Sequence, residues 1–215
     1  SHQGTIRGHT QMAITPFKTH RGKLVTLDRA NVDTDQIIPK QFLKSIKRTG
    51  FGEHLFDGWR YLPNGKPNPN FELNRSEFKG ASILVARNNF GSGSSREHAV
   101  WAVQQYGFKA VIAPSFADIF KTNCSKNGLL TIVLKEAEVE EIFQSISKAE
   151  GLEITVNLEE QQVTLHLSEE ISFRFEVEPA VKEQLIKGLD PIGLALEQKE
   201  TIEAFEARHQ TQYYT

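Results

Sequence analysis

The segment from Asn88 to His98, NNFGSGSSREH, combines small residues with side chains that can do chemistry. Gly91 and Gly93 allow the backbone to turn tightly and to approach a ligand closely. An apolar run at 81–86 precedes the segment and a helical run at 99–106 follows it. The start of a helix presents free N–H groups and the positive end of the helix dipole, which stabilise a carboxylate or phosphate. A serine that simply caps the helix is the plainer interpretation, but two Gly, three Ser and one Arg in six positions favour an anion site.

Ser94, Ser95 and Arg96 suggest three kinds of chemistry, two of which lack their motifs in this sequence. A serine hydrolase would need G-x-S-x-G, which is absent because Gly93 directly precedes Ser94 and Arg96 stands where a glycine belongs. The phosphate-binding pattern G-x-x-x-x-G-K-[ST] is also absent. Handling of a carboxylate ranks first, with a serine as base or donor and the arginine as a two-pronged clamp.

The aspartates near the end of the first strand and His98 are each open to two interpretations. Asp33 and Asp35 flank Thr34, so an extended backbone would present both carboxylates to a metal or a partner, whereas an Asx-type turn would use them locally. His98 lies four residues after Ser94, which allows a Ser–His relay on one helix face, but a packed histidine is the more common case. Cys124 is most simply a buried apolar residue.

The composition limits the class of protein. The 215 residues suit one domain. The 25 basic and 27 acidic residues give a net charge of −2, so the chain lacks the positive field that is typical of nucleic-acid-binding proteins. No apolar run reaches the roughly 18–20 residues that span a bilayer, and no secretory signal is visible. A single cysteine fits a reducing compartment such as the cytoplasm and cannot by itself hold an iron–sulfur cluster or structural zinc. We expect 1–11 to be an expression scar, 12–209 a single domain and 210–215 a tail.

The periodicity of the chain predicts an α/β fold. Strands at 81–86, 110–113 and 129–134 alternate with helices at 99–106, 116–126 and 138–147, which predicts a parallel sheet with its ligand beyond the carboxyl ends of the strands. Ser115 and Asp118 suggest a capping box for the second helix. A strand is expected at 23–27, an exposed loop at 62–70, and three appended antiparallel strands between 154 and 177. C-terminal helices are expected after Pro179 and at 201–209.

Several stretches resemble the swivelling domain of the aconitase superfamily, a β/β/α fold. The resemblance rests on 89–99 (NFGSGSSREHA), 113–129 (APSFADIFKTNCSKNGL) and 31–39 (NVDTDQIIP). The chain length and the block 48–61 are similar to the separate small chains of the two-chain dehydratases in this superfamily that act on isopropylmalate. The resemblance covers nearly everything from Met12 to about Arg208.

The resemblance implies a hydro-lyase that is active only with a large chain carrying a four-iron, four-sulfur cluster, so that this chain binds no metal itself. The implied reaction converts 2-isopropylmalate to 3-isopropylmalate by dehydration and rehydration, a step of leucine biosynthesis. By matching motif positions, Ser94 would be the catalytic base, Ser95 and Arg96 would bind the substrate carboxylate, and Asp35 would pair with a histidine of the large chain.

The superfamily also places a substrate-binding arginine shortly after that aspartate, and the region 42–48 does not match this feature cleanly. Leu43 and Ile46 suit an apolar substrate branch instead, so this segment is expected to set substrate choice. Two alternatives remain. One is a related dehydratase acting on homoaconitate or a citraconate/methylmalate-type substrate, and the other is an anion-binding module without catalysis.

Overall fold

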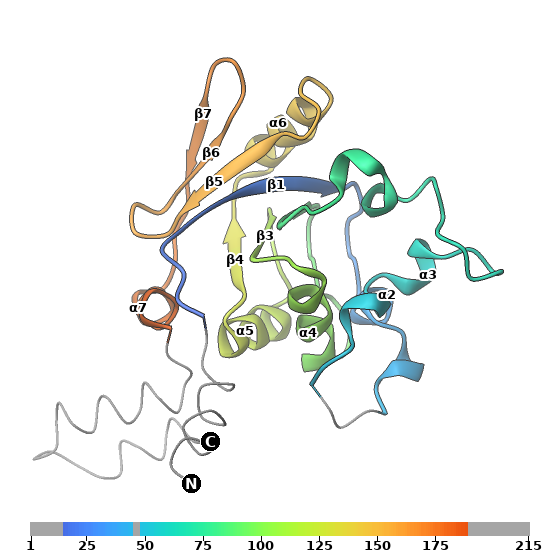
Figure 1. Cartoon of the computed structure of the whole chain (residues 1–215). Helices are drawn as coiled ribbons and strands as arrows, with labels where there is room; N and C mark the ends of the chain where they lie inside the picture. Colours follow the sequence, from blue (N-terminus) through green and yellow to red (C-terminus); the bar gives the residue numbers. More distant parts are fainter. Residues whose placement is uncertain (1–14, 45–47, 189–215) are drawn as a thin grey trace, which may run out of the picture.

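The computed structural model describes residues 15–44 and 48–188, and within these ranges one mixed sheet organises the molecule (Figure 1). Its strands lie in the order β4-β3-β2-β1-β5-β6-β7. Their bounds are Thr19–Leu27 for β1, Ile83–Ala86 for β2, Ala110–Ala113 for β3, Leu130–Val133 for β4, Glu153–Asn157 for β5, Gln162–Leu165 for β6 and Ile171–Arg174 for β7. The predicted fold class, a parallel sheet with appended antiparallel strands, is confirmed.

The parallel half contains β1 to β4 and the helices that connect them. Helix α4 (Glu97–Tyr106) joins β2 to β3, α5 (Asp118–Asn127) joins β3 to β4, and α6 (Glu136–Ile146) follows β4. β2 and β3 are buried at every position because helices cover both faces of this half, which is the usual setting of continuous apolar strands. The predicted alternation of strands and helices is confirmed.

Strand β1 joins the two halves. Its second part, Leu24–Leu27, pairs in parallel with β2, whereas its first part, Thr19–Lys23, pairs antiparallel with β5. The antiparallel strands are therefore continuous with the parallel sheet. The prediction began this strand only at Lys23, because residues 19–22 (THRG) contain no apolar residue to mark a strand.

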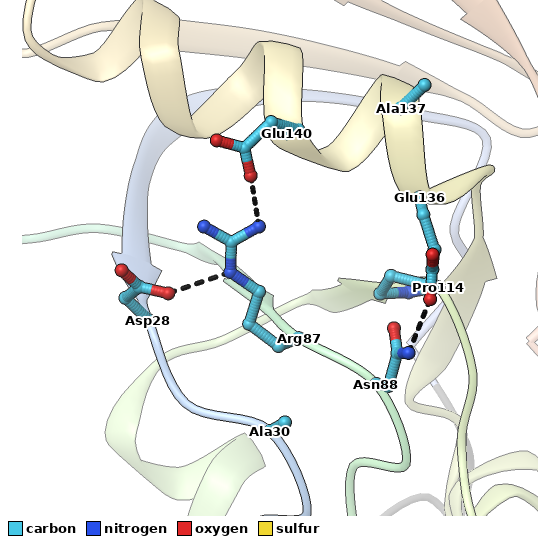
Figure 2. A pocket seen from close by; sticks show the side chains of 8 residues that line it. All are labelled: Asp28, Ala30, Arg87, Asn88, Pro114, Glu136, Ala137 and Glu140. Atoms are coloured by element: carbon cyan, nitrogen blue, oxygen red, sulfur yellow. Dashed lines mark hydrogen bonds and ion pairs between the residues drawn. The ribbon is translucent and has the colours of Figure 1, made fainter.

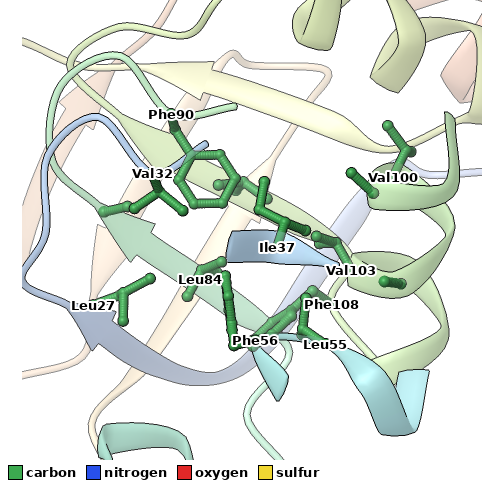
Figure 3. Close-up of a cluster of buried hydrophobic side chains, with 14 of the residues drawn as sticks. Leu27, Val32, Ile37, Leu55, Phe56, Leu84, Phe90, Val100, Val103 and Phe108 are labelled. Atoms are coloured by element: carbon green, nitrogen blue, oxygen red, sulfur yellow. The ribbon is translucent and has the colours of Figure 1, made fainter. Parts of the chain in front are cut away.

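Two hydrophobic cores lie on opposite faces of the sheet, since neighbouring residues of a strand point to opposite sides. The first core contains Leu84 and packs against α4 and the segment between β1 and β2; Figure 3 shows its central members, which include Leu27, Phe56, Phe90, Val100 and Val103. The second core contains Ile83 and packs against α6, the antiparallel strands and helix α7 (Pro179–Lys187).

The chain between β1 and β2 forms short helical turns. These are α2 (Thr34–Ile37), α3 (Asp57–Arg60) and 3-10 turns at Lys40–Phe42, Gly52–His54, Glu72–Asn74 and Ser76–Phe78. Phe56 and Phe71 are buried beneath them. The segment 62–70 forms no helix or regular strand, as predicted, apart from an isolated bridge between Tyr61 and Pro67.

Some boundaries differ from the predictions. Helix α4 begins at Glu97, two residues before its predicted start. Helix α5 begins at Asp118, and no side chain caps it, so the predicted capping box is wrong. The Ser115 hydroxyl instead accepts a hydrogen bond from the amide N–H of Asn89, at 2.8 Å. The predicted scar at 1–11, the helix at 201–209 and the tail at 210–215 lie outside the described residues. Among the helices that are described, none is both long and apolar enough to cross a membrane.

Candidate active site

Three loops meet where the parallel strands β1, β2 and β3 end, and the serine-rich loop lies between the other two. On one side it forms a parallel bridge from Phe90 to Phe116, and on the other a parallel bridge from Ser92 to Asp33. The amide N–H groups of Gly91 and Ser92 donate to the carbonyl of Val32, at 2.7 and 3.1 Å. The loop thus behaves as a short strand clamped at both edges, which fixes the residues that follow it.

The two glycines of this loop are required by its shape. Gly91 has φ +85°, and a Cβ atom there would lie 2.2 Å from Cγ of Phe120. Gly93 has φ +91°, a conformation that side chains disfavour. The loop therefore packs directly on α5 and then reverses toward α4.

Ser94 and Ser95 are both exposed at the end of the loop. The Ser94 carbonyl accepts a 2.8 Å hydrogen bond from the hydroxyl of Thr34, whose side chain is buried. No hydrogen bond to another described residue engages the Ser94 hydroxyl. The backbone at this position is held while the reactive oxygen stays accessible.

Arg96 immediately precedes α4, and no side chain caps that helix. The plainer interpretation, in which a serine caps the helix, is therefore wrong. Of the first-turn N–H groups, that of Ala99 donates to the Arg96 carbonyl at 3.2 Å, and no side chain caps the others, which can bind solvent or a ligand. Nη1 of Arg96 is buried and lies 2.9 Å from Oδ1 of Asp35, an ion pair whose geometry does not form a hydrogen bond. Within 15–44 and 48–188, Nη1 has no hydrogen-bond acceptor, so the guanidinium keeps donor capacity for an anion.

The two aspartates have different environments. Asp33 caps α2: its carboxylate accepts from the N–H of Gln36 at 2.8 Å, while the Gln36 side chain accepts from the N–H of Asp33 at 3.0 Å. The turn interpretation is therefore confirmed for Asp33. Asp35 lies in the first turn of α2, about half exposed, and faces Arg96. The structure does not present the two carboxylates as a pair.

His98 and Cys124 have structural surroundings. The His98 ring packs edge-on against Phe51, with centroids 5.3 Å apart, and lies 4.8 Å from the ring of Trp101. This favours the packed histidine over the relay. Cys124 is fully buried, and burial raises the pKa of its thiol well above the usual range, which disfavours the thiolate needed for metal binding. The described part of the chain contains no cluster of three or more His, Cys, Asp or Glu suited to a metal ion.

Sequence reasoning missed Asn123, which the structure places at this site. Its side chain is 7% exposed, and Nδ2 donates a 3.0 Å hydrogen bond to the hydroxyl of Ser95. The available signal was an asparagine on the face of α5 that also carries the buried residues Phe120 and Cys124, because a buried amide needs a partner.

A cavity of about 570 Å³ opens beside the loop, between the ends of β1 to β3 and the start of α6 (Figure 2). Arg87 crosses it and contacts the carboxylates of Asp28, at 2.7 Å, and Glu140. Asn88 donates to Glu136 on its other side. Asp28 and Glu140 already neutralise the guanidinium of Arg87, so this cavity is a poor site for an anion. The contact of Arg87 with Glu140 instead joins α6 to the end of the sheet.

The substrate-choice segment is only partly described. Leu43 is half-buried and packs against the first core, whereas Ile46 lies outside the described residues. The neighbouring Phe42 stacks on His54, with ring centroids 3.7 Å apart.

Comparisons with known proteins identify the fold and the family of the chain. Residues 14–137 match the family model described as the aconitase C-terminal domain, and residues 140–179 match the model LeuD_N. Two relatives, each called 3-isopropylmalate dehydratase small subunit, come from Methylibium petroleiphilum (55% identity, covering 89% of this chain and 92% of the relative) and Desulforapulum autotrophicum (53% identity, covering 91% and 96%). A crystal structure of 3-isopropylmalate dehydratase from Methanocaldococcus jannaschii aligns with a TM-score of 0.62 at 25% identity, over 86% of this chain and 98% of that one.

The fold and the serine–arginine loop thus define an aconitase-type swivelling domain. At more than half identity over most of its length, the chain belongs to the family of 3-isopropylmalate dehydratase small subunits.

Proposed function

We propose that this chain is the base-bearing and carboxylate-binding subunit of a two-chain hydro-lyase. The complex isomerises 2-isopropylmalate to 3-isopropylmalate by dehydration and rehydration, a step of leucine biosynthesis in the cytoplasm. The names of the relatives support the reaction. The observation that carries the site is the exposed Ser94 at the start of α4, two residues from an arginine with unused donor capacity.

Ser94 is proposed to remove the proton from the carbon beside a substrate carboxylate. A serine hydroxyl is too weak an acid to ionise unaided, so its alkoxide needs a positive environment. The uncapped start of α4 and the guanidinium of Arg96 supply that environment. The same positive field stabilises the charge that builds on the carboxylate as the proton leaves. In the rehydration half-reaction Ser94 returns the proton to the alkene.

Ser95 and Arg96 are proposed to hold the substrate carboxylate. Arg96 can do so as a fork, through two parallel N–H donors. Ser95 is exposed and immediately precedes Arg96, so its hydroxyl can contribute a further hydrogen bond. Together they orient the acidic C–H bond toward Ser94.

The partner is proposed to be a large subunit that covers the carboxyl ends of the parallel strands. The iron–sulfur cluster is assigned to that subunit, because this chain offers only one thiol, which is buried. The cluster would supply a Lewis acid for the departing hydroxyl. Asp35 is half-exposed at this edge and would pair with a histidine of the partner. Ile119, in the first turn of α5, is 56% exposed and offers an apolar contact beside the site.

Two other functions fit parts of the site. A related dehydratase for homoaconitate or a citraconate/methylmalate-type substrate would use the same loop with a different segment at 42–48. An anion-binding module would use the start of α4 without the chemistry of Ser94. The relatives favour the isopropylmalate reaction over both.

Substitution of the base tests the proposal. In the complex with the large subunit, Ser94→Ala should lower kcat by about 10²- to 10⁴-fold, the usual contribution of a general base, while subunit association stays unchanged. The matched control is Ser92→Ala, because within the described residues the Ser92 hydroxyl donates only to the carbonyl of Asn31, at 3.3 Å. Alkene diacid formation, followed by ultraviolet absorbance, measures turnover. Normal turnover of Ser94→Ala would reject the catalytic assignment and favour the binding module.

A further inference from the structure

The backbone at Asn123 is fixed by hydrogen bonds within α5 and between α5 and α4. Its backbone carbonyl accepts a 2.8 Å hydrogen bond from Nδ2 of Asn127, one turn further along α5. Asn127 in turn accepts from the indole N–H of Trp101, at 2.9 Å, and from the side chain of Gln104, at 2.6 Å, both on α4. This network fixes α5 against α4, so Asn123 reaches the start of α4 from a defined position.

The direction of the bond between Asn123 and Ser95 determines what the Ser95 hydroxyl can do. A serine hydroxyl has one proton to donate and two lone pairs to accept with, whereas an amide nitrogen only donates. Because Nδ2 of Asn123 donates to Oγ of Ser95, the hydroxyl proton of Ser95 cannot point at Asn123 and must point elsewhere. A donor that also accepts a hydrogen bond is polarised, which strengthens the bond it makes.

We propose that Asn123 is a positioning residue that makes Ser95 a hydrogen-bond donor toward the substrate carboxylate. This inference rests on the proposed function, in which Ser95 binds that carboxylate. A neutral amide suits the position, because an aspartate of the same shape would accept the Ser95 proton and place a negative charge beside the anion. Asn123 thereby acts through Ser95 and does not itself contact the substrate.

The near-isosteric substitution Asn123→Asp tests the polarity of this bond. In the complex with the large subunit, it should raise KM for 2-isopropylmalate about 10- to 100-fold with little change in kcat, which is the pattern of lost ground-state binding. Asn123→Ala removes the donor without reversing the bond and should raise KM only about 2- to 10-fold. Loss of packing alone would predict the opposite order, because alanine leaves the larger void.

Repeating both substitutions in a Ser95→Ala background separates the bond from simple charge repulsion. If Asn123 acts through Ser95, the effect of Asn123→Ala on KM should disappear in this background and that of Asn123→Asp should shrink. Equal effects in both backgrounds would overturn the inference while leaving the proposed function intact. An unchanged KM for Ser95→Ala alone would overturn the role of Ser95 and this inference together. If Asn123→Asp does not fold, the loss of the Asn123→Ala effect in the Ser95→Ala background decides by itself.

Discussion

Asp35 and Arg96 form an ion pair between the loops that follow β1 and β2, with Oδ1 2.9 Å from Nη1. Asp35 is 52% exposed and Arg96 only 19%, so the carboxylate lies nearer to solvent and the guanidinium deeper in the site. The pair partly balances the charge of Arg96 without using its Nη1 hydrogen-bond donors. Both residues therefore remain available for further partners, an anion for Arg96 and a cation for Asp35.

The fork geometry of Arg96 leads to the first prediction. Arg96→Lys keeps the charge but replaces two parallel donors by a single ammonium. We expect kcat/KM of the complex to fall about 10- to 100-fold, equivalent to about 1.5–3 kcal/mol for a hydrogen bond to a charged group. Steady-state kinetics measures the loss. Arg75→Lys is the matched control, because Arg75 is exposed and its guanidinium lies 4.0 Å from Glu77; equal losses in both variants would contradict the assigned role.

Substitution of the other partner should separate stability from catalysis. Because the Asp35 carboxylate is about half exposed, its ion pair with Arg96 is expected to contribute only about 0–1 kcal/mol to the free energy of unfolding. Asp35→Asn should therefore leave the stability of the isolated chain nearly unchanged. In the complex we expect kcat to fall at least about tenfold and its pH profile to shift, because a histidine loses its carboxylate partner. Chemical denaturation and a pH–rate profile test the two halves. An unchanged pH–rate profile would show that Asp35 does not pair with a histidine of the partner.

The contact between the loop and α5 predicts a large effect at Gly91. A Cβ atom at this position would collide with the Phe120 ring, 2.2 Å away, and φ is +85°. Gly91→Ala should lower the free energy of unfolding by about 2–4 kcal/mol, combining roughly 1 kcal/mol for the backbone with overpacking of 1–3 kcal/mol. Gly65→Ala is the control, since Gly65 has φ +84° but no atom within 4 Å of its Cβ position. Similar losses in both variants would show that the contact with Phe120 carries no cost.

Much of the parallel half was predictable because its signals are local. The strand at Ala110–Ala113 was predicted with its observed bounds, since a short, fully apolar run between two helices has few alternatives in an α/β fold. The position of the serine-rich loop at the carboxyl ends of the strands followed from the same pattern.

The remaining features depend on contacts that a single sequence does not display. The ion pair of Asp35 with Arg96 and the bond of Asn123 to Ser95 join residues 61 and 28 positions apart. The start of α5 was also misplaced, because the Ser115 hydroxyl accepts from the Asn89 N–H of the neighbouring loop instead of capping its own helix. Long-range partners therefore overrode the local capping preference.

The segment at 42–48 gives a prediction about substrate choice. Burial of an apolar branch contributes roughly 0.8 kcal/mol per CH₂, and Leu43 is half-buried against the first core. Leu43→Arg and Ile46→Arg should shift relative turnover from isopropyl substrates toward citrate-like substrates, because a guanidinium replaces an apolar contact. Competition assays of the complex measure this ratio. An unchanged ratio in both variants would place the determinant of substrate choice elsewhere.

His20 links the antiparallel half to the parallel half and predicts a pH dependence of stability. Its Nε2 lies 2.7 Å from the hydroxyl of Ser82, the residue just before β2. Burial, and to a lesser extent the charge of Lys109, lower the pKa of His20 below its ordinary value of 6.5. Folding therefore favours the neutral imidazole, and the unfolded chain binds the proton more readily.

The sign of the effect follows from this difference. The contribution of neutral His20 is fully present above the unfolded pKa, about 6.5, and is lost as the pH falls through that value toward the lower folded pKa. His20→Gln cannot titrate and can still donate a hydrogen bond to Ser82. We therefore expect the isolated wild-type chain to lose more stability between pH 7.5 and 5.5 than the His20→Gln variant. Urea midpoints at several pH values measure the difference, and parallel curves for the two proteins would show that His20 does not contribute to the pH dependence.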